Sequence, residues 1–182
     1  MSRRFFLLTA FGKDRPGIVA TLTHTLYKAG ANLEDASMTR LGGEFSIMLT
    51  LSLPGTIPLS RFQKQLRPME RNAGLTLTLR PIPSALARGR KESFADGLIS
   101  VYGTDKPGIV FHVTELLAKR RVNITDLQTK VLPRKPAPLY VMLLEVRLPS
   151  GMKSDVLRQE LEKIRLSLGV DLSYQDIEPL TL

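Results

Sequence analysis

The chain has 182 residues, of which 43% are apolar, and it contains no cysteine. This length allows one ordinary domain or two small ones, each with a modest core. The lack of cysteine excludes disulfides and thiolate metal sites. No apolar run approaches the roughly 20 residues that a membrane-spanning helix requires, so we expect a cytoplasmic protein with no membrane association.

The formal net charge of +9 lies almost wholly in the first half of the chain. Residues 1–90 carry 13 Lys and Arg against 5 Asp and Glu (13 − 5 = +8), whereas residues 91–182 carry 13 against 12 (13 − 12 = +1). A basic half is compatible with nucleic acid, an acidic protein partner or anionic ligands. Charge alone does not decide among these.

The first predicted element is a strand over Phe5–Phe11. The preceding Arg3-Arg4 pair resembles a twin-arginine export signal, but the apolar run is about the minimum for a signal core and no small-residue cleavage site follows. We therefore interpret the run as structure. A helix is expected next over Pro16–Ala29, with Gly30 at its end.

A hairpin and a second helix complete the first half of the chain. The strands Leu33–Leu41 and Phe45–Leu53 flank Gly42-Gly43, and the second strand alternates apolar with polar residues. A helix over residues 60–72 and a strand over 75–80 follow. Pro68 is anomalous inside that helix, where it costs about 3 kcal/mol, so we expect a kink or an early end.

The second half of the chain repeats the first. GKDRPGIV (residues 12–19) recurs as GTDKPGIV (103–110), and residues 7–41 align with 98–132 at an offset of 91 (105 − 14 = 91). A four-residue insertion within 133–138 then changes the offset to 95 (140 − 45 = 95). Each copy therefore has the order βαββαβ, an α+β ferredoxin-like sandwich. We expect units at residues 1–82 and 94–182, joined by a Pro-, Arg- and Ser-rich linker at 83–93.

The repeated motifs resemble a known module. D-[RK]-P-G-I-V at the strand–helix junction and [AV]-N-[LI]-x-D after the helix look like an ACT domain, a small amino-acid-sensing regulatory unit. Two such units without a catalytic domain are similar to the glycine cleavage system transcriptional repressor family. The resemblance covers essentially the whole chain and implies two tandem ACT domains.

The resemblance also implies a function and a site. It implies a non-catalytic regulatory protein that binds glycine or a similar amino acid, needs no cofactor, and acts through a partner transcription factor without binding nucleic acid directly. ACT effectors bind where the first strand meets the first helix, often at a seam between two units, which is compatible with a homo-oligomer. Carried over by position, the ligand residues are Asp14, Arg15, Gly17, Ile18 and Asn32, and Asp105, Lys106, Gly108, Ile109 and Asn123.

Simple physical chemistry supports such a site. We expect Gly17 and Gly108 in the first helical turn, where unpaired N–H groups and the helix dipole favour a carboxylate. Asp14 and Asp105 could face the ligand's ammonium group. Alternatively, the two acids could simply cap the helices. The second copy also departs from the first, because Arg121 stands where the first has Gly30 and the second helix lacks its glycine terminator.

Other functional classes have weaker support in the sequence. The only two histidines, His24 and His112, do not recur at equivalent positions, and no catalytic motif is present, so we expect no enzyme. RNA recognition motifs share the topology, but the third strand offers no aromatic platform for bases. A detached regulatory subunit of an amino-acid metabolic enzyme stays open as an alternative. Four cations at helical spacing are most simply a solvated face: Arg61, Lys64, Arg67 and Arg71.

Overall fold

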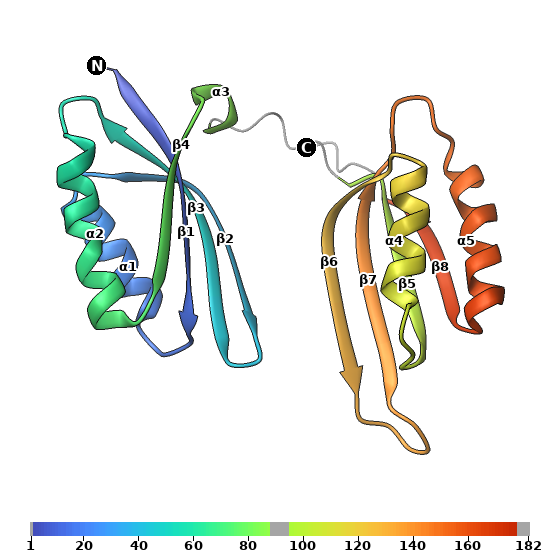
Figure 1. The fold of residues 1–182 in the computed structure, drawn as a ribbon. Coiled ribbons are helices and arrows are strands. Elements are labelled where there is room, and N and C mark those ends of the chain that lie inside the picture. The colour runs from blue at the N-terminus through green and yellow to red at the C-terminus, as the bar shows by residue number, and fades with distance from the viewer. Residues whose placement is uncertain (1, 88–94, 178–182) are drawn as a thin grey trace. The chain divides into compact units, whose positions relative to one another are not determined.

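The computed structural model describes residues 2–87 and 95–177. The chain forms two compact units, Met1–Glu92 and Ser93–Leu182, and each is a sheet with helices on one face (Figure 1). The expected linker begins with a short helix, α3 (Ser84–Ala87), and residues 88–94 lie outside the described part of the chain.

The first unit has the predicted βαββαβ order. Its sheet is antiparallel with strand order β2-β3-β1-β4, so the first and third strands lie in the middle. Both crossover connections place their helices on the same face of the sheet. The elements are β1 (Arg3–Lys13), α1 (Ile18–Lys28), β2 (Asn32–Leu41), β3 (Glu44–Pro54), α2 (Leu59–Ala73) and β4 (Thr76–Ile82).

The second unit repeats this topology with strand order β6-β7-β5-β8. The long helices of the two units correspond residue for residue at the offset of 95 (154 − 59 = 95, 168 − 73 = 95). The predicted tandem α+β fold is therefore confirmed. The elements are β5 (Gly97–Thr104), α4 (Ile109–Lys119), β6 (Asn123–Leu132), β7 (Leu139–Arg147), α5 (Ser154–Leu168) and β8 (Asp171–Asp176).

Strand alternation decides which side chains form each core. In the first unit Leu8 and Leu49 point from the central strands toward Leu22 and Phe62 of the helices, and all four are fully buried. Each such burial contributes about 1.5–3 kcal/mol. The second unit has its own separate core around Val101, Leu144 and Leu117.

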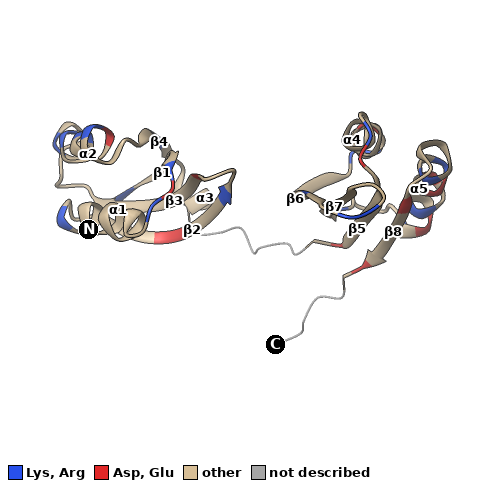
Figure 2. Ribbon diagram, turned by 90° about the horizontal axis from the view of Figure 1, so that it is seen from below, with Lys and Arg blue, Asp and Glu red and all other residues tan. Residues whose placement is uncertain are grey.

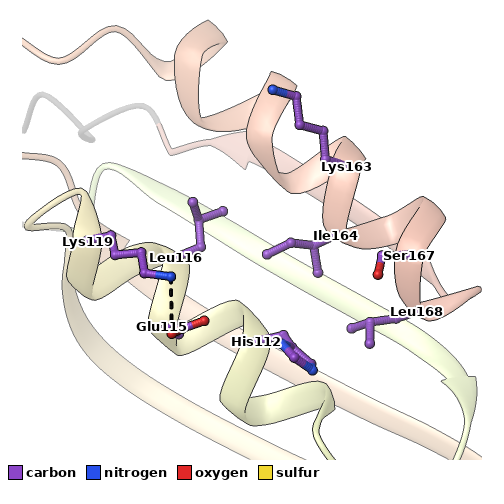
Figure 3. A pocket seen from close by; sticks show the side chains of 8 residues that line it. All are labelled: His112, Glu115, Leu116, Lys119, Lys163, Ile164, Ser167 and Leu168. Carbon is purple, nitrogen blue, oxygen red and sulfur yellow. Dashed lines mark ion pairs between the residues drawn. The ribbon is translucent and has the colours of Figure 1, made fainter.

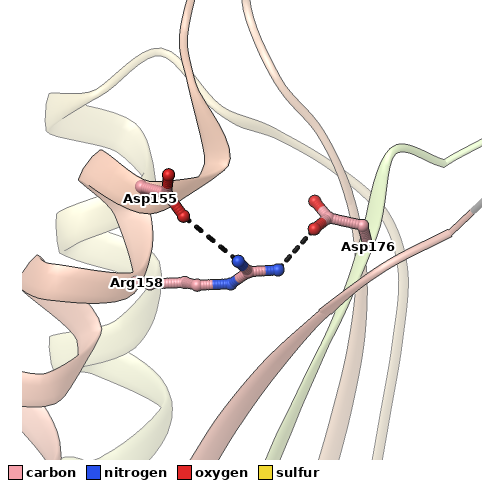
Figure 4. Close-up of polar contacts among 3 residues, drawn as sticks. All are labelled: Asp155, Arg158 and Asp176. Carbon is pink, nitrogen blue, oxygen red and sulfur yellow. Dashed lines mark hydrogen bonds and ion pairs between the residues drawn. The ribbon is translucent and has the colours of Figure 1, made fainter.

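An Arg side chain joins α5 to the edge strand β8 in the second unit. Arg158 makes ion pairs with Asp155 on its own helix, at 3.1 Å, and with Asp176 on β8 (Figure 4). Its guanidinium group also lies over the Tyr174 ring, 5.3 Å from the ring centre. Burial first, and then the Asp176 charge, raise the pKa of Tyr174 to about 12. The phenol therefore stays protonated at neutral pH, and Arg158 bridges α5 and β8.

The early end predicted at Pro68 is wrong. Helix α2 continues five residues beyond it to Ala73 and closes at Gly74, which has a left-handed backbone (φ 63°). Packing of Phe62, Leu66 and Met69 on the sheet, all buried, holds the helix together across the proline. Tertiary packing here outweighs a local propensity penalty.

Replacing Pro68 by Ala is expected to raise the free energy of unfolding of the first unit by about 1–3 kcal/mol, because the exposed helix interior regains an N–H donor and loses a ring clash. Urea denaturation followed by circular dichroism measures this. The reciprocal control is Lys163→Pro at the equivalent position of α5 (163 − 95 = 68), which should cost about 3 kcal/mol. A Pro68→Ala variant less stable than the parent would contradict the interpretation.

The missing glycine after α4 does not change the local geometry. Arg121 adopts φ 56°, in the same left-handed region as Gly30 at φ 77°. Both turns are closed by the same bond across five residues, from Ala31 N to Leu26 O (3.0 Å) and from Val122 N to Leu117 O (2.9 Å). The second unit thus keeps the turn and holds a non-glycine residue in a strained conformation.

Arg121→Gly is therefore expected to stabilise the second unit by about 0.5–1 kcal/mol. Glycine relieves the backbone strain of the folded state, and the greater conformational entropy that it gives the unfolded chain offsets part of this gain. The same urea experiment reports it. Gly30→Arg should do the opposite, since a Cβ there would also lie 2.8 Å from Ile57 Cδ1. Equal stability of the Arg121→Gly variant and the parent would show that the turn is not strained.

Candidate functional site

The bend between the first strand and first helix of each unit is built around a left-handed glycine. Gly17 (φ 84°) and Gly108 (φ 97°) are the N-cap residues of α1 and α4. Each lies one position before the first helical turn, whereas we expected it within that turn. Neither helix has a side-chain cap hydrogen bond. The alternative that Asp14 and Asp105 serve as helix caps is therefore wrong.

The bend leaves backbone amides pointing away from the helix. Thr21 N donates to Gly17 O at 2.9 Å, which starts the helical pattern. Among the described residues, the N–H groups of Val19 and Ala20 have no acceptor. In the second unit His112 N bonds Gly108 O in the same way, at 2.9 Å. Each helix thus presents free donors at the positive end of its dipole.

The space over the two bends differs. A Cβ added at Gly17 would meet nothing within 4 Å, so this bend is open. At Gly108 it would lie 3.4 Å from Cδ2 of His112, the residue that replaces Thr21 in the repeat (112 − 91 = 21). His112 is an exposed helical residue whose ring lies against the second bend.

Asp14 is held by an arginine that the sequence did not single out. Its carboxylate lies 2.7 Å from Nε of Arg40 on β2, and its side chain is 23% exposed. Its backbone N–H donates to Gly43 O at 3.0 Å. The hairpin register could have revealed the pair, because Arg40 sits opposite Phe45, close to the end of β1.

Asp105 has different surroundings. Val131 replaces Arg40 (131 − 91 = 40) and Tyr140 replaces Phe45 (140 − 95 = 45). Asp105 makes no ion pair among the described residues. Burial raises the pKa of Tyr140, a hydrogen bond with Thr129 opposes that rise, and the negative charge of Asp105 adds to it. The second acid is thus near a phenol rather than a cation.

The remaining predicted residues near the bends have unequal access to solvent. Arg15 is exposed, and its Nη2 lies 3.5 Å from the Asn72 carbonyl at the end of α2. Lys106 is exposed as well. Ile18 and Ile109 are 3% and 2% exposed, so their side chains belong to the cores. A ligand at either bend would meet only the backbone of these two residues.

The structure does not bring the two asparagines to the bends. Helix α1, 11 residues and so about 16 Å long, separates Gly17 from Asn32 at the start of β2. Asn32 is exposed and donates to Oε1 of Glu34 at 3.0 Å. Asn123 starts β6 at the corresponding end of the second unit. One small amino acid cannot touch Asp14 and Asn32 of the same unit.

The basic residues of α2 form an exposed face that the second unit lacks. Arg61, Lys64, Arg67 and Arg71 are exposed, and none has an ion-pair partner among the described residues. Figure 2 shows blue segments along α2. At the offset of 95, the equivalent positions of α5 are Val156, Gln159, Glu162 and Leu166.

Each open sheet face carries an exposed aromatic ring that sequence reasoning missed. Phe11 on β1 is 54% exposed and its repeat equivalent on β5, Tyr102, is 40% exposed (102 − 91 = 11). The sequence argument against an aromatic platform concerns the third strand of each unit, whereas these rings lie on the first. Alternation along the first strand, with Phe6, Leu8 and Ala10 buried, could have revealed Phe11.

Two further observations concern other site classes. No cluster of His, Cys, Asp or Glu among the described residues could hold a metal ion. Within the same part of the chain, the helices are too short or too polar to cross a bilayer.

Comparison with known proteins identifies the family. A model of the ACT domain matches residues 4–80 and again 97–175, one match for each βαββαβ unit. The chain belongs to the ACT domain family. Both matches of this tandem ACT protein include the strand–helix bend.

Curated relatives and solved structures agree with this assignment. The ACT protein is 28% identical to the glycine cleavage system transcriptional repressor of Escherichia coli K12 over 153 residues, covering 78% of this chain and 74% of the repressor. A UPF0237 protein of Methanococcus maripaludis is 36% identical over 80 residues, which is 43% of this chain and 83% of that protein.

Two solved structures match both units. A protein of unknown function from Galdieria sulphuraria superposes with a TM-score of 0.80 at 27% identity, covering 97% of this chain and 100% of that one. A candidate glycine cleavage system transcriptional repressor gives a TM-score of 0.68 at 20% identity, covering 98% and 100%, which shows the shared fold. The relationships place this ACT protein among regulatory proteins.

Asp105→Asn is expected to lower the pKa of Tyr140, because the carboxylate's negative charge disfavours the tyrosinate and the amide removes that charge. A pH titration of ¹³Cζ-labelled tyrosine by NMR measures the change. The matched control is Asp126→Asn, an exposed carboxylate on β6 bonded to Gln128. An unchanged or raised Tyr140 pKa in the Asp105 variant would show that Asp105 does not lie over the phenol.

Proposed function

We propose that this protein is a non-catalytic amino-acid sensor whose ligand occupancy changes its docking onto a transcriptional regulator. The observation that carries the proposal is the duplicated bend, in which a left-handed glycine caps a helix and no side chain takes the exposed amides. A side-chain cap would have used those donors. Because neither helix has such a cap, its free donors remain, and this leaves two places suited to a small anionic group.

A free amino acid complements both charges at the bend. Its carboxylate would accept hydrogen bonds from the free amides, such as those of Val19 and Ala20, at the positive end of α1. Its ammonium group would face the Asp that precedes the glycine. In the second unit the space over the bend is limited, because the His112 ring lies 3.4 Å from the position that a Cβ on Gly108 would take. Glycine is the amino acid that suits this space best.

The two bends should bind with unequal strength. In the first unit a ligand's ammonium group would compete with Arg40, which lies 2.7 Å from the Asp14 carboxylate. In the second unit Val131 takes that position, and Asp105 has no cation to displace among the described residues. Displacing a partly exposed ion pair costs up to about 1 kcal/mol, or a factor of about five in affinity. We therefore assign the tighter site to Asp105.

The asparagines are not part of the ligand site proposed at the bend of their own unit. Because α1 separates Asn32 from Gly17 and α4 separates Asn123 from Gly108, neither unit can offer both to one ligand. An exposed Asn from another copy of the chain could complete the site and thereby couple ligand binding to assembly. The partner is inferred from the related Escherichia coli protein, which is a transcriptional repressor.

Affinity should be modest. Glycine has five non-hydrogen atoms, and a ceiling of about 1.5 kcal/mol per atom gives about 7.5 kcal/mol, weaker than about 1 μM. Realistic dissociation constants lie between tens of micromolar and millimolar, as suits an abundant metabolite.

A thermal-shift panel of the twenty amino acids at millimolar concentration tests the proposal on the full chain. Glycine or a similarly small amino acid should raise the melting temperature of the wild type, because ligand binding to the native state stabilises it. Asp105→Ala should remove most of the shift at low ligand concentration. Asp14→Ala should leave that part of the shift in place.

Arg40→Ala provides the matched control, since it frees Asp14 without altering the second bend. It should tighten binding at the first site. If no amino acid stabilises the wild type, the sensor proposal is wrong. If ligand binds and an immobilised chain then recovers a metabolic enzyme rather than a transcriptional regulator, the assigned partner is wrong and the sensor survives.

A further inference from the structure

A groove of about 260 Å³ lies between the two helices of the second unit, away from the sheet (Figure 3). Leu116 of α4 and Ile164 and Leu168 of α5 project into the space between the helices and form an apolar floor. All three are only partly buried. The rim is polar: His112, Glu115, Lys119, Lys163 and Ser167.

The first unit provides an internal comparison, because it carries different side chains at two of the groove positions. Met69 stands at the position of Ile164 (164 − 95 = 69) and Thr25 at that of Leu116 (116 − 91 = 25). Met69 is 3% exposed, and its sulfur accepts a hydrogen bond from the Thr25 hydroxyl at 3.3 Å. The unbranched Met69 side chain therefore reaches from α2 to α1 in the first unit, whereas Ile164 and Leu116 line a groove in the second.

The rim of the groove has one positive charge without a direct partner. Lys119 is neutralised by Glu115 at 3.1 Å, and Figure 3 shows the two side chains meeting on α4. Lys163 makes no ion pair among the described residues, and Glu160, one turn earlier, is already bonded to Arg120. A ligand with a single negative charge would therefore complement the groove.

We propose that the groove between α4 and α5 is a binding site for a small monocarboxylate with an apolar chain. The volume of about 260 Å³ equals about nine water volumes at about 30 Å³ each, which suits a ligand of about eight or nine non-hydrogen atoms. The chain lies on Leu116, Ile164 and Leu168, and the carboxylate meets Lys163. This site is separate from the amino-acid bend and does not depend on it.

The groove also adjoins that bend through one side chain. His112 lines the groove, and the same ring lies 3.4 Å from the position of a Cβ on Gly108. An occupant that shifts the ring therefore changes the space available at the bend. In the second unit His112 therefore connects the proposed polar site at the bend with the proposed apolar site in the groove. The first unit has Thr21 at this position.

Sodium hexanoate, which has eight non-hydrogen atoms, is the probe, and hexylamine is its charge-reversed control. A ¹H–¹⁵N NMR titration of the full chain should show hexanoate moving the amides of α4 and α5, with a dissociation constant on the order of 1 mM. Hexylamine should bind at least about tenfold more weakly. Equal binding of both probes, or shifts confined to other elements, would overturn the proposal.

Variants then test the floor and the rim. Ile164→Met introduces the longer, unbranched side chain of the first unit and should weaken hexanoate binding about tenfold or more, while Lys163→Gln should weaken it several-fold. Ser167→Phe covers the groove from an exposed position and keeps the test valid if Ile164→Met fails to fold. Hexanoate binding unchanged in both groove-filling variants would overturn the assignment. A glycine titration run alongside separates this outcome from failure of the sensor.

Discussion

Each unit depends on a reversal of the chain direction between its first strand and first helix without a side-chain cap. The left-handed glycines at 17 and 108 make that reversal possible, since an L-residue there costs about 1–2 kcal/mol. Because the bend lies over a core sealed by Ile18 or Ile109, it cannot collapse inward. Unsatisfied amides at such a place are tolerated only where water or a ligand reaches them.

The duplication makes the chain its own comparison. The units share topology, the bend and even the turn after the first helix, where Arg121 adopts the conformation of Gly30. They differ in two places among the described residues: Asp14 pairs with Arg40 whereas Asp105 has no ion pair, and Met69 bonds Thr25 where Ile164 and Leu116 line a groove. Shared features therefore indicate what the fold requires, and the differences distinguish the two proposed ligand sites.

The sequence predicted the fold well because its signals were local and repeated. Alternation in Phe45–Leu53 and the Gly42-Gly43 hairpin decide the strands, and the repeat decides the topology. Prediction from the sequence failed where packing overrides local preference, as at Pro68. It also failed where a contact joins distant segments, as between Asp14 and Arg40. The separation of Asn32 from its bend already followed from the helix expected over Pro16–Ala29, because that helix lies between them.

If the proposed sensor function holds, the unequal environments of Asp14 and Asp105 have a physiological consequence. Two receptors of the same ligand on one polypeptide, with half-saturation points several-fold apart, respond over a broader span of metabolite levels than two identical ones. The output would then rise gradually with nutrient supply instead of switching at one threshold. A single Arg in the first copy, replaced by Val131 in the second, is enough to spread the response in this way.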